Sequence, residues 1–140
     1  SKNRVQLYKN VFQPKLKHPQ TLAVIGLVQP LGAIFPIAEL HSRWFCLLMK
    51  GQRKLPSEEQ MLRIVKEDNE RNAKRYYEST RHTIQVDWVA CMDEIATLVG
   101  VKPNLYTIAL TDPLLWYKMY FGPCLPYQYR LTGPHPWKGA

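Results

Sequence analysis

The chain has 140 residues, of which 46% are hydrophobic and 21% are charged. This is the length and composition of one globular domain with a buried core, and it excludes disorder along the whole chain. The net charge is +8, and no apolar run reaches the roughly 18 residues that a membrane-spanning helix needs.

Basic residues are concentrated near the N-terminus. Residues 1–20 hold five basic side chains and no acidic one: Lys2, Arg4, Lys9, Lys15 and Lys17. Such a segment can attract phosphates, nucleic acid or anionic lipid, although the usual reading of basic residues is a solvated surface. Residues 5–12 alternate in part between apolar and polar side chains, which predicts a short edge strand.

Residues 21–50 are the most informative part of the chain. Residues 21–28 are uncharged and rich in β-branched and apolar side chains, which predicts a strand buried on both faces, as in a parallel sheet. Pro30 and Gly32 interrupt this run, after which apolar residues recur at helical spacing as far as Leu48, before Gly51. A strand, a glycine-containing turn and a helix bring a helix N-terminus to the carboxyl end of a sheet, where open α/β sheets bind ligands.

The following segments predict two helices. Ser57 and Gln60 form a capping-box pattern that begins a long, solvated helix ending near Tyr76 and Tyr77. Asp87 is expected to cap the next helix, which ends at Gly100. On this helix the adjacent Asp93 and Glu94 suggest acid–base chemistry, but neighbours in a helix point in different directions, so we expect solvated carboxylates.

The last third of the chain is rich in aromatic residues and proline. After a break at Pro103 and Asn104, Asp112 followed by Pro113 predicts a helix as far as Gly122. Aromatic side chains cover much of its circumference, so it is either buried in a core or faces a partner or lipid. Alternation over residues 127–131 then favours a strand.

Sequence motifs for known chemistries are absent. The chain has no CxxC, HExxH, GxSxG, GxGxxG or P-loop pattern, and none of its four histidines stands at i, i+4 with another ligand. We therefore assign no catalytic residue and no metal ligand. From the residues alone, the chain is a basic α/β domain, and a non-enzymatic module that binds anionic lipid or nucleic acid is an alternative function.

Ten segments resemble, in order, the region of vertebrate flavin-containing monooxygenases (the dimethylaniline monooxygenase type) in which the chain returns to the FAD domain. They cover nearly the whole chain: residues 24–32, 36–40, 42–44, 55–57, 81–85, 100–104, 111–113, 121–124, 127–131 and 133–134. The resemblance implies an α/β fold of a few strands and about four helices. It also implies that the chain is the C-terminal part of a longer flavoprotein with two dinucleotide-binding domains.

The resemblance divides the chain into two parts. Residues 1–51 would be a strand–turn–helix that completes the FAD-binding domain. Residues 52–140 would form a helical C-terminal lobe that covers the active site and the membrane side. The two glycine-rich dinucleotide motifs would precede Ser1, and a hydrophobic membrane tail would follow Ala140.

The implied activity is oxygenation of soft nitrogen or sulfur nucleophiles, dependent on NADPH and O2, through a C4a-hydroperoxyflavin. The implied cofactors are FAD and NADPH, held mainly by parts of the longer protein outside this chain, so the chain alone would be inactive. The implied partners are small xenobiotic-type nucleophiles, O2 and a membrane surface at the cytosolic face of the endoplasmic reticulum. Nucleic acid is not among them, and a homodimer is left open.

The strand–turn–helix then becomes the candidate cofactor site. The helix N-terminus would stabilise negative charge on the reduced flavin. His41 stands where the family more often has glutamine, so packing and a flavin-side role are equally supported for it. The expected cofactor-binding residues are Gln29, Pro30, Leu31, Gly32, Pro36 and His41.

Overall fold

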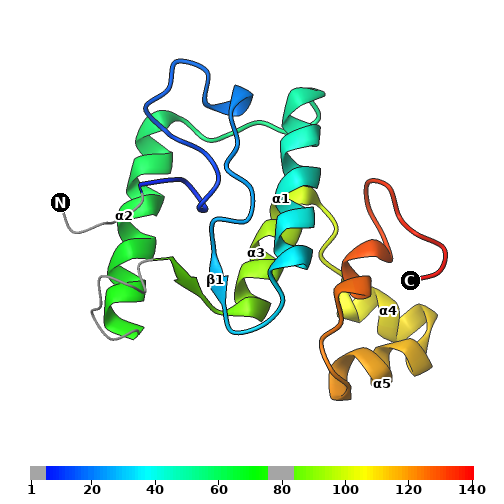
Figure 1. The fold of residues 1–140 in the computed structure, drawn as a ribbon. Helices are drawn as coiled ribbons and strands as arrows, with labels where there is room; N and C mark the ends of the chain where they lie inside the picture. Colours follow the sequence, from blue (N-terminus) through cyan, green and yellow to red (C-terminus); the bar gives the residue numbers. More distant parts are fainter. Residues whose placement is uncertain (1–5, 76–83) are drawn as a thin grey trace.

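The computed structural model describes residues 6–75 and 84–140 (Figure 1). Its main body contains three helices, α1 (Ile34–Met49), α2 (Glu58–Arg75) and α3 (Trp88–Val99). A parallel two-stranded sheet pairs β1 (Gln29–Pro30) with β2 (Gln85–Val86). A smaller lobe follows, with α4 (Leu105–Thr111), α5 (Pro113–Phe121) and the 3-10 helix η2 (Pro126–Arg130). The described chain is thus mixed α/β and mostly helical, which confirms the predicted fold class.

The first described residues form a tight loop, so the edge strand predicted for residues 5–12 is wrong; Val5 itself lies outside the described residues. Lys9 and Asn10 have positive φ angles of 51° and 58°. They reverse the chain, and Tyr8 and Phe12 form an antiparallel bridge. Tyr8, Val11 and Phe12 are buried. The loop therefore places its apolar side chains in the core without a strand.

Residues 21–28 also differ from the prediction, because they do not form a strand buried on both faces. A single turn of 3-10 helix, η1 (Pro19–Thr21), comes first, and the chain then runs extended. Leu22 is 57% exposed and Ile25 41%, and Val28 is the one buried residue of this segment. A strand buried on both faces lies inside a sheet whose two faces are covered by other elements, whereas in the described residues the only ladder is to β2 and reaches only Gln29 and Pro30.

Helix α1 confirms the helical prediction for the next segment. It begins at Ile34, two residues before the expected Pro36, and its buried residues follow the predicted spacing: Ile37, Leu40, His41, Trp44, Leu47 and Leu48. The helix ends at Met49, and Gly51 takes a positive φ of 68°. Glycine adopts this left-handed conformation without the steric cost that a Cβ would bring.

The predicted helix caps are formed by the expected side chains. The Ser57 N–H donates to Gln60 Oε1 at 3.1 Å, and the Gln60 N–H donates to Ser57 Oγ at 3.3 Å. Asp87 accepts from the Ala90 N–H at 3.1 Å and begins α3, which Gly100 ends in a left-handed conformation. The predicted end of α2 near Tyr76 and Tyr77 lies outside the described residues.

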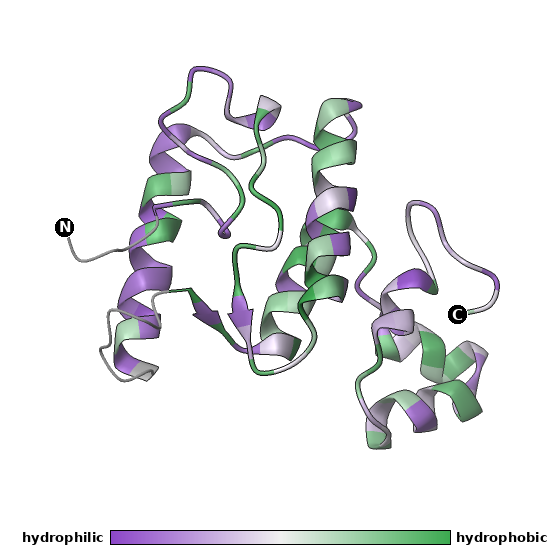
Figure 2. Cartoon of the chain, viewed as in Figure 1, coloured by the Kyte–Doolittle hydropathy of each residue, from purple (hydrophilic) through white to green (hydrophobic). Residues whose placement is uncertain are grey.

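One core joins the N-terminal loop to the three long helices. Trp44 of α1 contacts Phe12 and Tyr8 edge-on, with ring centroids 4.8 and 5.9 Å apart. Met61 of α2 and Ile95 of α3 belong to the same buried cluster. Figure 2 shows the contrast between α2, which is largely hydrophilic, and α1 and α3, which carry hydrophobic residues along their length. The core therefore contains residues from before and after residue 51. That residues 1–51 complete an FAD-binding domain and residues 52–140 form a separate lobe of a longer protein stays a prediction.

The C-terminal lobe contains one element that we predicted and two that we did not. Helix α5 begins as expected, because Asp112 Oδ1 accepts from the Leu115 N–H at 2.9 Å. Helix α4 was not predicted, although Asn104 caps it by accepting from the Tyr106 N–H at 3.0 Å. The strand predicted over residues 127–131 is wrong: this segment is η2, which begins with Pro126, a residue whose φ is restricted and which has no N–H for a ladder.

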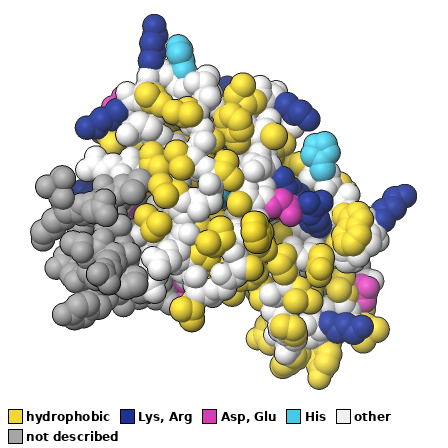
Figure 3. All heavy atoms as spheres, in the orientation of Figure 1, with side chains coloured by type: hydrophobic (Ala, Val, Ile, Leu, Met, Phe, Trp, Pro, Cys, Tyr) yellow, Lys and Arg dark blue, Asp and Glu magenta, His cyan; other side chains and the backbone are white. Residues whose placement is uncertain are grey.

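Much of helix α5 is exposed. No residue of this helix is buried, although Trp116, which stacks on the exposed Tyr120 with ring centroids 5.3 Å apart, is half-buried. Leu114 and Phe121 are each 65% exposed. Figure 3 shows hydrophobic side chains gathered at the lower right of the view, over the lobe that contains α5. Of the two alternatives, burial in the core of the described residues is therefore wrong, and a face toward a partner or lipid stays a prediction.

Candidate functional site

The turn between β1 and α1 projects from the surface. The Gln29 N–H donates to Ile84 O at 2.8 Å, which joins β1 to the chain just before β2. Beyond Pro30 the turn is exposed: Leu31 is 90% exposed, and Phe35 in the first turn of α1 is 86% exposed. Leu31 and Phe35 therefore give this turn an exposed apolar surface.

The start of α1 carries a partial positive charge that neither a side-chain cap nor an acid of its own first turn reduces. Ala33 is the N-cap and has no side-chain oxygen to accept from the first N–H groups, and the first turn contains no acidic residue. Pro36, in the third helical position, has no N–H. The remaining donors of this turn and the helix dipole favour an anion or an electron-rich group nearby. That the group at this position is the edge of a reduced flavin stays a prediction.

Trp88 holds this turn from the side of α3, and sequence reasoning missed it. Its Nε1–H donates to Ala33 O at 2.8 Å. A Cβ added at Gly32 would lie 3.1 Å from Trp88 Cδ1, so the indole packs directly against the turn. The sequence showed Trp88 only as a member of the apolar face of a helix, because its partner lies 55 residues away.

His41 is placed differently from the other predicted site residues. Gln29, Pro30, Leu31, Gly32 and Pro36 lie at or near the surface around the turn, whereas His41 is fully buried in α1. Its Nδ1 accepts from the Gly26 N–H at 3.4 Å. A contact between His41 and a flavin therefore stays a prediction.

The protonation state of His41 follows from its burial. Desolvation lowers its pKa from 6.5 to about 4, so the ring is neutral at physiological pH. A neutral ring that accepts at Nδ1 carries its proton on Nε2. That nitrogen is buried and has no hydrogen-bond partner in the described part of the chain.

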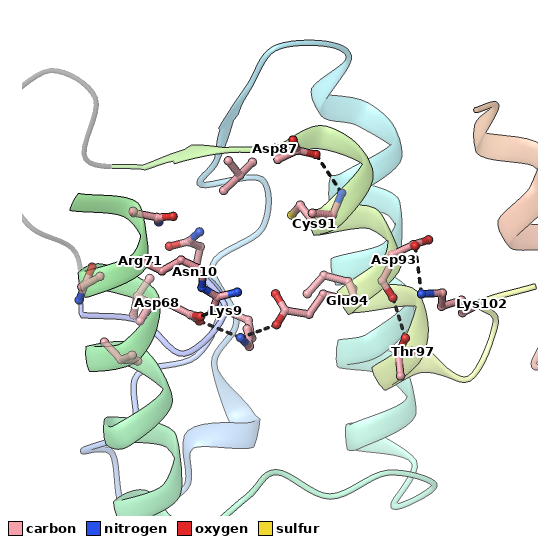
Figure 4. Close-up of a pocket in the computed structure, with 17 residues that line it drawn as sticks. Lys9, Asn10, Asp68, Arg71, Asp87, Cys91, Asp93, Glu94, Thr97 and Lys102 are labelled. Atoms are coloured by element: carbon pink, nitrogen blue, oxygen red, sulfur yellow. Dashed lines mark hydrogen bonds and ion pairs between the residues drawn. The ribbon is translucent and has the colours of Figure 1, made fainter. Parts of the chain in front are cut away.

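A second candidate is a pocket of about 410 Å³ between α2 and α3 (Figure 4). Lys9 lies on one wall with its side chain 9% exposed, and its Nζ is 2.7 Å from Asp68 and 2.6 Å from Glu94. Burial alone would lower the pKa of Lys9, but the hydrogen bonds to these two carboxylates outweigh it and raise the pKa. Lys9 therefore stays charged and links α2 to α3.

Asp93 and Glu94 are both engaged in tertiary contacts, which corrects the expectation that they are only solvated. Asp93 Oδ1 accepts from the Tyr129 hydroxyl at 2.8 Å, and Asp93 Oδ2 lies 3.0 Å from Lys102 Nζ. Asp93 thus connects α3 to the C-terminal lobe, while Glu94 connects it to the N-terminal loop. These ion pairs hold the fold together and do not form an acid–base dyad.

The α2–α3 pocket shows no nucleophile or metal cluster. Burial raises the pKa of Cys91 to about 12, so its thiol is protonated and a poor nucleophile. Within residues 6–75 and 84–140, no three His, Cys, Asp or Glu side chains are grouped to hold a metal ion. The turn before α1 is therefore the better candidate site. A search of the described helices found none long and apolar enough to cross a bilayer.

Comparison with known proteins covers the whole chain. A family model described as "Flavin-binding monooxygenase-like" matches residues 1–140. Flavin-containing monooxygenase 5 of Cavia porcellus is 55% identical over 139 residues, which are 99% of this chain and 26% of the relative. The Homo sapiens protein of the same name is 52% identical, and dimethylaniline monooxygenase (N-oxide-forming) 2 of Mus musculus is 47% identical, each with the same coverage. The chain spans about a quarter of the length of these relatives.

Proposed function

The chain belongs to the flavin-containing monooxygenase family, and we propose that it is the C-terminal part of an NADPH- and O2-dependent enzyme that oxygenates soft nitrogen or sulfur nucleophiles. The observation that carries this proposal is 55% identity over 99% of the chain to a flavin-containing monooxygenase. FAD and NADPH would be held mainly by the rest of the longer protein. The 140 residues alone would then be inactive.

Within this enzyme, the turn before α1 would face the flavin. A bound flavin supplies the oxidising chemistry, using NADPH as the reductant and O2 as the source of the transferred oxygen. The chain's own contribution would be electrostatic and steric. The start of α1 has no side-chain cap and no acid in its first turn, which favours negative charge at the flavin edge. Leu31 and Phe35, both strongly exposed here, would exclude water from that edge.

The C-terminal lobe would face the membrane and the substrate entrance. Helix α5 exposes Tyr117, Tyr120 and Phe121 by 58 to 65%, and aromatic side chains of this kind favour the membrane–water interface. We place this surface at the cytosolic face of the endoplasmic reticulum membrane, where small apolar amines and sulfides concentrate.

The alternative of a basic binding module has weaker support. Lys9, one of the five basic residues of the N-terminal segment, is nearly buried and paired with Asp68 and Glu94. It is therefore unavailable to a phosphate. Lys15 and Lys17 are exposed, but two solvated lysines are ordinary protein surface.

The test uses the full-length protein and, as a control, the 140-residue chain. We expect the full-length protein to show the visible absorbance of bound flavin, to couple NADPH oxidation to the oxygenation of a tertiary amine or a sulfide, and to sediment with lipid vesicles. The isolated chain should bind no flavin and consume no NADPH. A full-length protein without flavin or NADPH consumption would contradict the proposal. Tight, strongly salt-dependent binding of an oligonucleotide by the chain would favour the alternative.

A further inference from the structure

Only a few contacts determine where the turn between β1 and α1 lies. The backbone ladder to β2 ends at Pro30, and α1 begins at Ile34. Between these elements, Leu31 is almost fully exposed and Gly32 has a φ of 147°. The path of these residues must therefore be set by side-chain contacts from outside the turn.

Trp88 supplies such contacts from the first residue of α3. Its Nε1–H donates to Ala33 O at 2.8 Å, and its ring lies against Gly32, where an added Cβ would be 3.1 Å from Cδ1. The carbonyl of an N-cap residue already accepts the first intrahelical hydrogen bond, and its second lone pair remains for the indole. The hydrogen bond thus sets the direction of the first turn of α1, and the ring limits how far Gly32 can move toward α3.

We propose that Trp88 is a positioning residue for the flavin-facing turn. It fixes Gly32 and Ala33, and through them the N-terminus of α1, against the start of α3. This inference rests on the proposed function, because it assigns Trp88 to the site in which the turn contacts the flavin. Trp88 itself does not touch the flavin: it acts through the position of the helix N-terminus, whose partial charge weakens if the helix start moves away.

The test compares Trp88→Phe with wild type in the full-length protein. Phenylalanine keeps an aromatic ring against Gly32 but removes the indole N–H. Trp137→Phe is the matched control, because Trp137 is 51% exposed in the C-terminal loop and lies outside the turn. Three quantities are measured: amide hydrogen exchange of residues 37–39 at the start of α1, the dissociation constant for FAD added to apoprotein, and the reduction potential of the flavin at saturating FAD.

In Trp88→Phe we expect amide exchange of residues 37–39, the first hydrogen-bonded amides of α1, to be about three- to tenfold faster and FAD binding to be weaker by a similar factor, which is the range that the loss of one neutral hydrogen bond gives. The reduction potential should fall, since the helix start stabilises the reduced flavin less well. Trp137→Phe should change none of the three. If Trp88 only stabilised the fold, Trp88→Phe would lower the free energy of unfolding but would leave the reduction potential of the FAD-saturated enzyme unchanged.

The outcomes for Trp88→Phe test whether Trp88 positions the turn before α1. Wild-type exchange over residues 37–39, or a wild-type reduction potential, in Trp88→Phe overturns the inference. If wild-type protein bound no flavin, the proposed function would fail, and the exchange comparison would still show whether Trp88 positions the turn. Should Trp88→Phe not fold, Trp88→Tyr, which also lacks the indole N–H, is measured in the same way and with the same criteria.

Discussion

Replacing Trp44 with alanine is expected to lower the free energy of unfolding by about 4 kcal/mol. Trp44 is 2% exposed and lies edge-on to Phe12 and Tyr8, with ring centroids 4.8 and 5.9 Å away. Its removal leaves a cavity between the N-terminal loop and α1, and it removes the aromatic contacts that hold the loop. Urea denaturation followed by circular dichroism measures the loss without relying on tryptophan fluorescence.

Trp137→Ala is the matched control for this prediction. Trp137 is 51% exposed, and its ring lies near that of Tyr127 with centroids 6.2 Å apart. Because little surface is buried there, we expect a loss of less than about 1 kcal/mol. Equal losses for the two variants would show that Trp44 does not occupy the centre of the core.

Acidification is expected to destabilise the protein through His41. Burial lowers the pKa of His41 from 6.5 to about 4, so the unfolded chain binds a proton at a higher pH than the folded protein. The stability associated with neutral His41 is therefore fully present above about pH 6.5 and is lost as the pH falls toward 4. At about 1.4 kcal/mol for each pH unit, the loss is about 3 kcal/mol.

The comparison of wild type with His41→Asn isolates this effect from the titration of carboxylates. Asparagine can place an acceptor near the position of Nδ1, which accepts from the Gly26 N–H, but it does not titrate. The difference in unfolding free energy between the two proteins should shrink by about 3 kcal/mol between pH 7 and pH 4. His18→Asn, the same substitution at an exposed position, is the matched control. A pH-independent difference for His41→Asn would mean that burial does not perturb this histidine.

The helices could be predicted because their signals are local. The capping pair Ser57 and Gln60, the cap Asp87, and Asp112 followed by Pro113 all form the hydrogen bonds or helix starts expected of them. The spacing of buried residues in α1 was also readable, because a helix satisfies its own backbone and needs a partner only for one face. Helix α4 was missed since a break at Pro103 and Asn104 was read as a loop, although asparagine is a good cap.

The strands could not be predicted because they depend on other segments. Residues 21–28 have the composition of a buried strand, yet the described part of the chain offers β2 as the only ladder, and β2 reaches just Gln29 and Pro30. Alternation over residues 127–131 gave no sign that Pro126 begins a 3-10 helix. Periodicity describes which side chains are apolar, but pairing is decided by what lies beside the segment.

The candidate site was predicted in part. The turn of Gln29 to Gly32 and the helix start near Pro36 were found from Pro30, Gly32 and the change of period. Trp88 and Lys9 were not found, because their partners lie 55 and 59 residues away in the sequence. A tryptophan in an apolar stripe and a lysine in a basic segment have many ordinary explanations, and only their contacts single them out.

In the proposed enzyme, the turn before α1 lies against the flavin. Hydrogen exchange of the full-length protein, measured for apoprotein and for FAD-loaded protein, tests it most directly. We predict that FAD slows exchange in peptides covering residues 29–36 and leaves peptides from α5 unchanged. Unchanged exchange over residues 29–36 in a protein that has demonstrably bound FAD would contradict a position of this turn against the flavin.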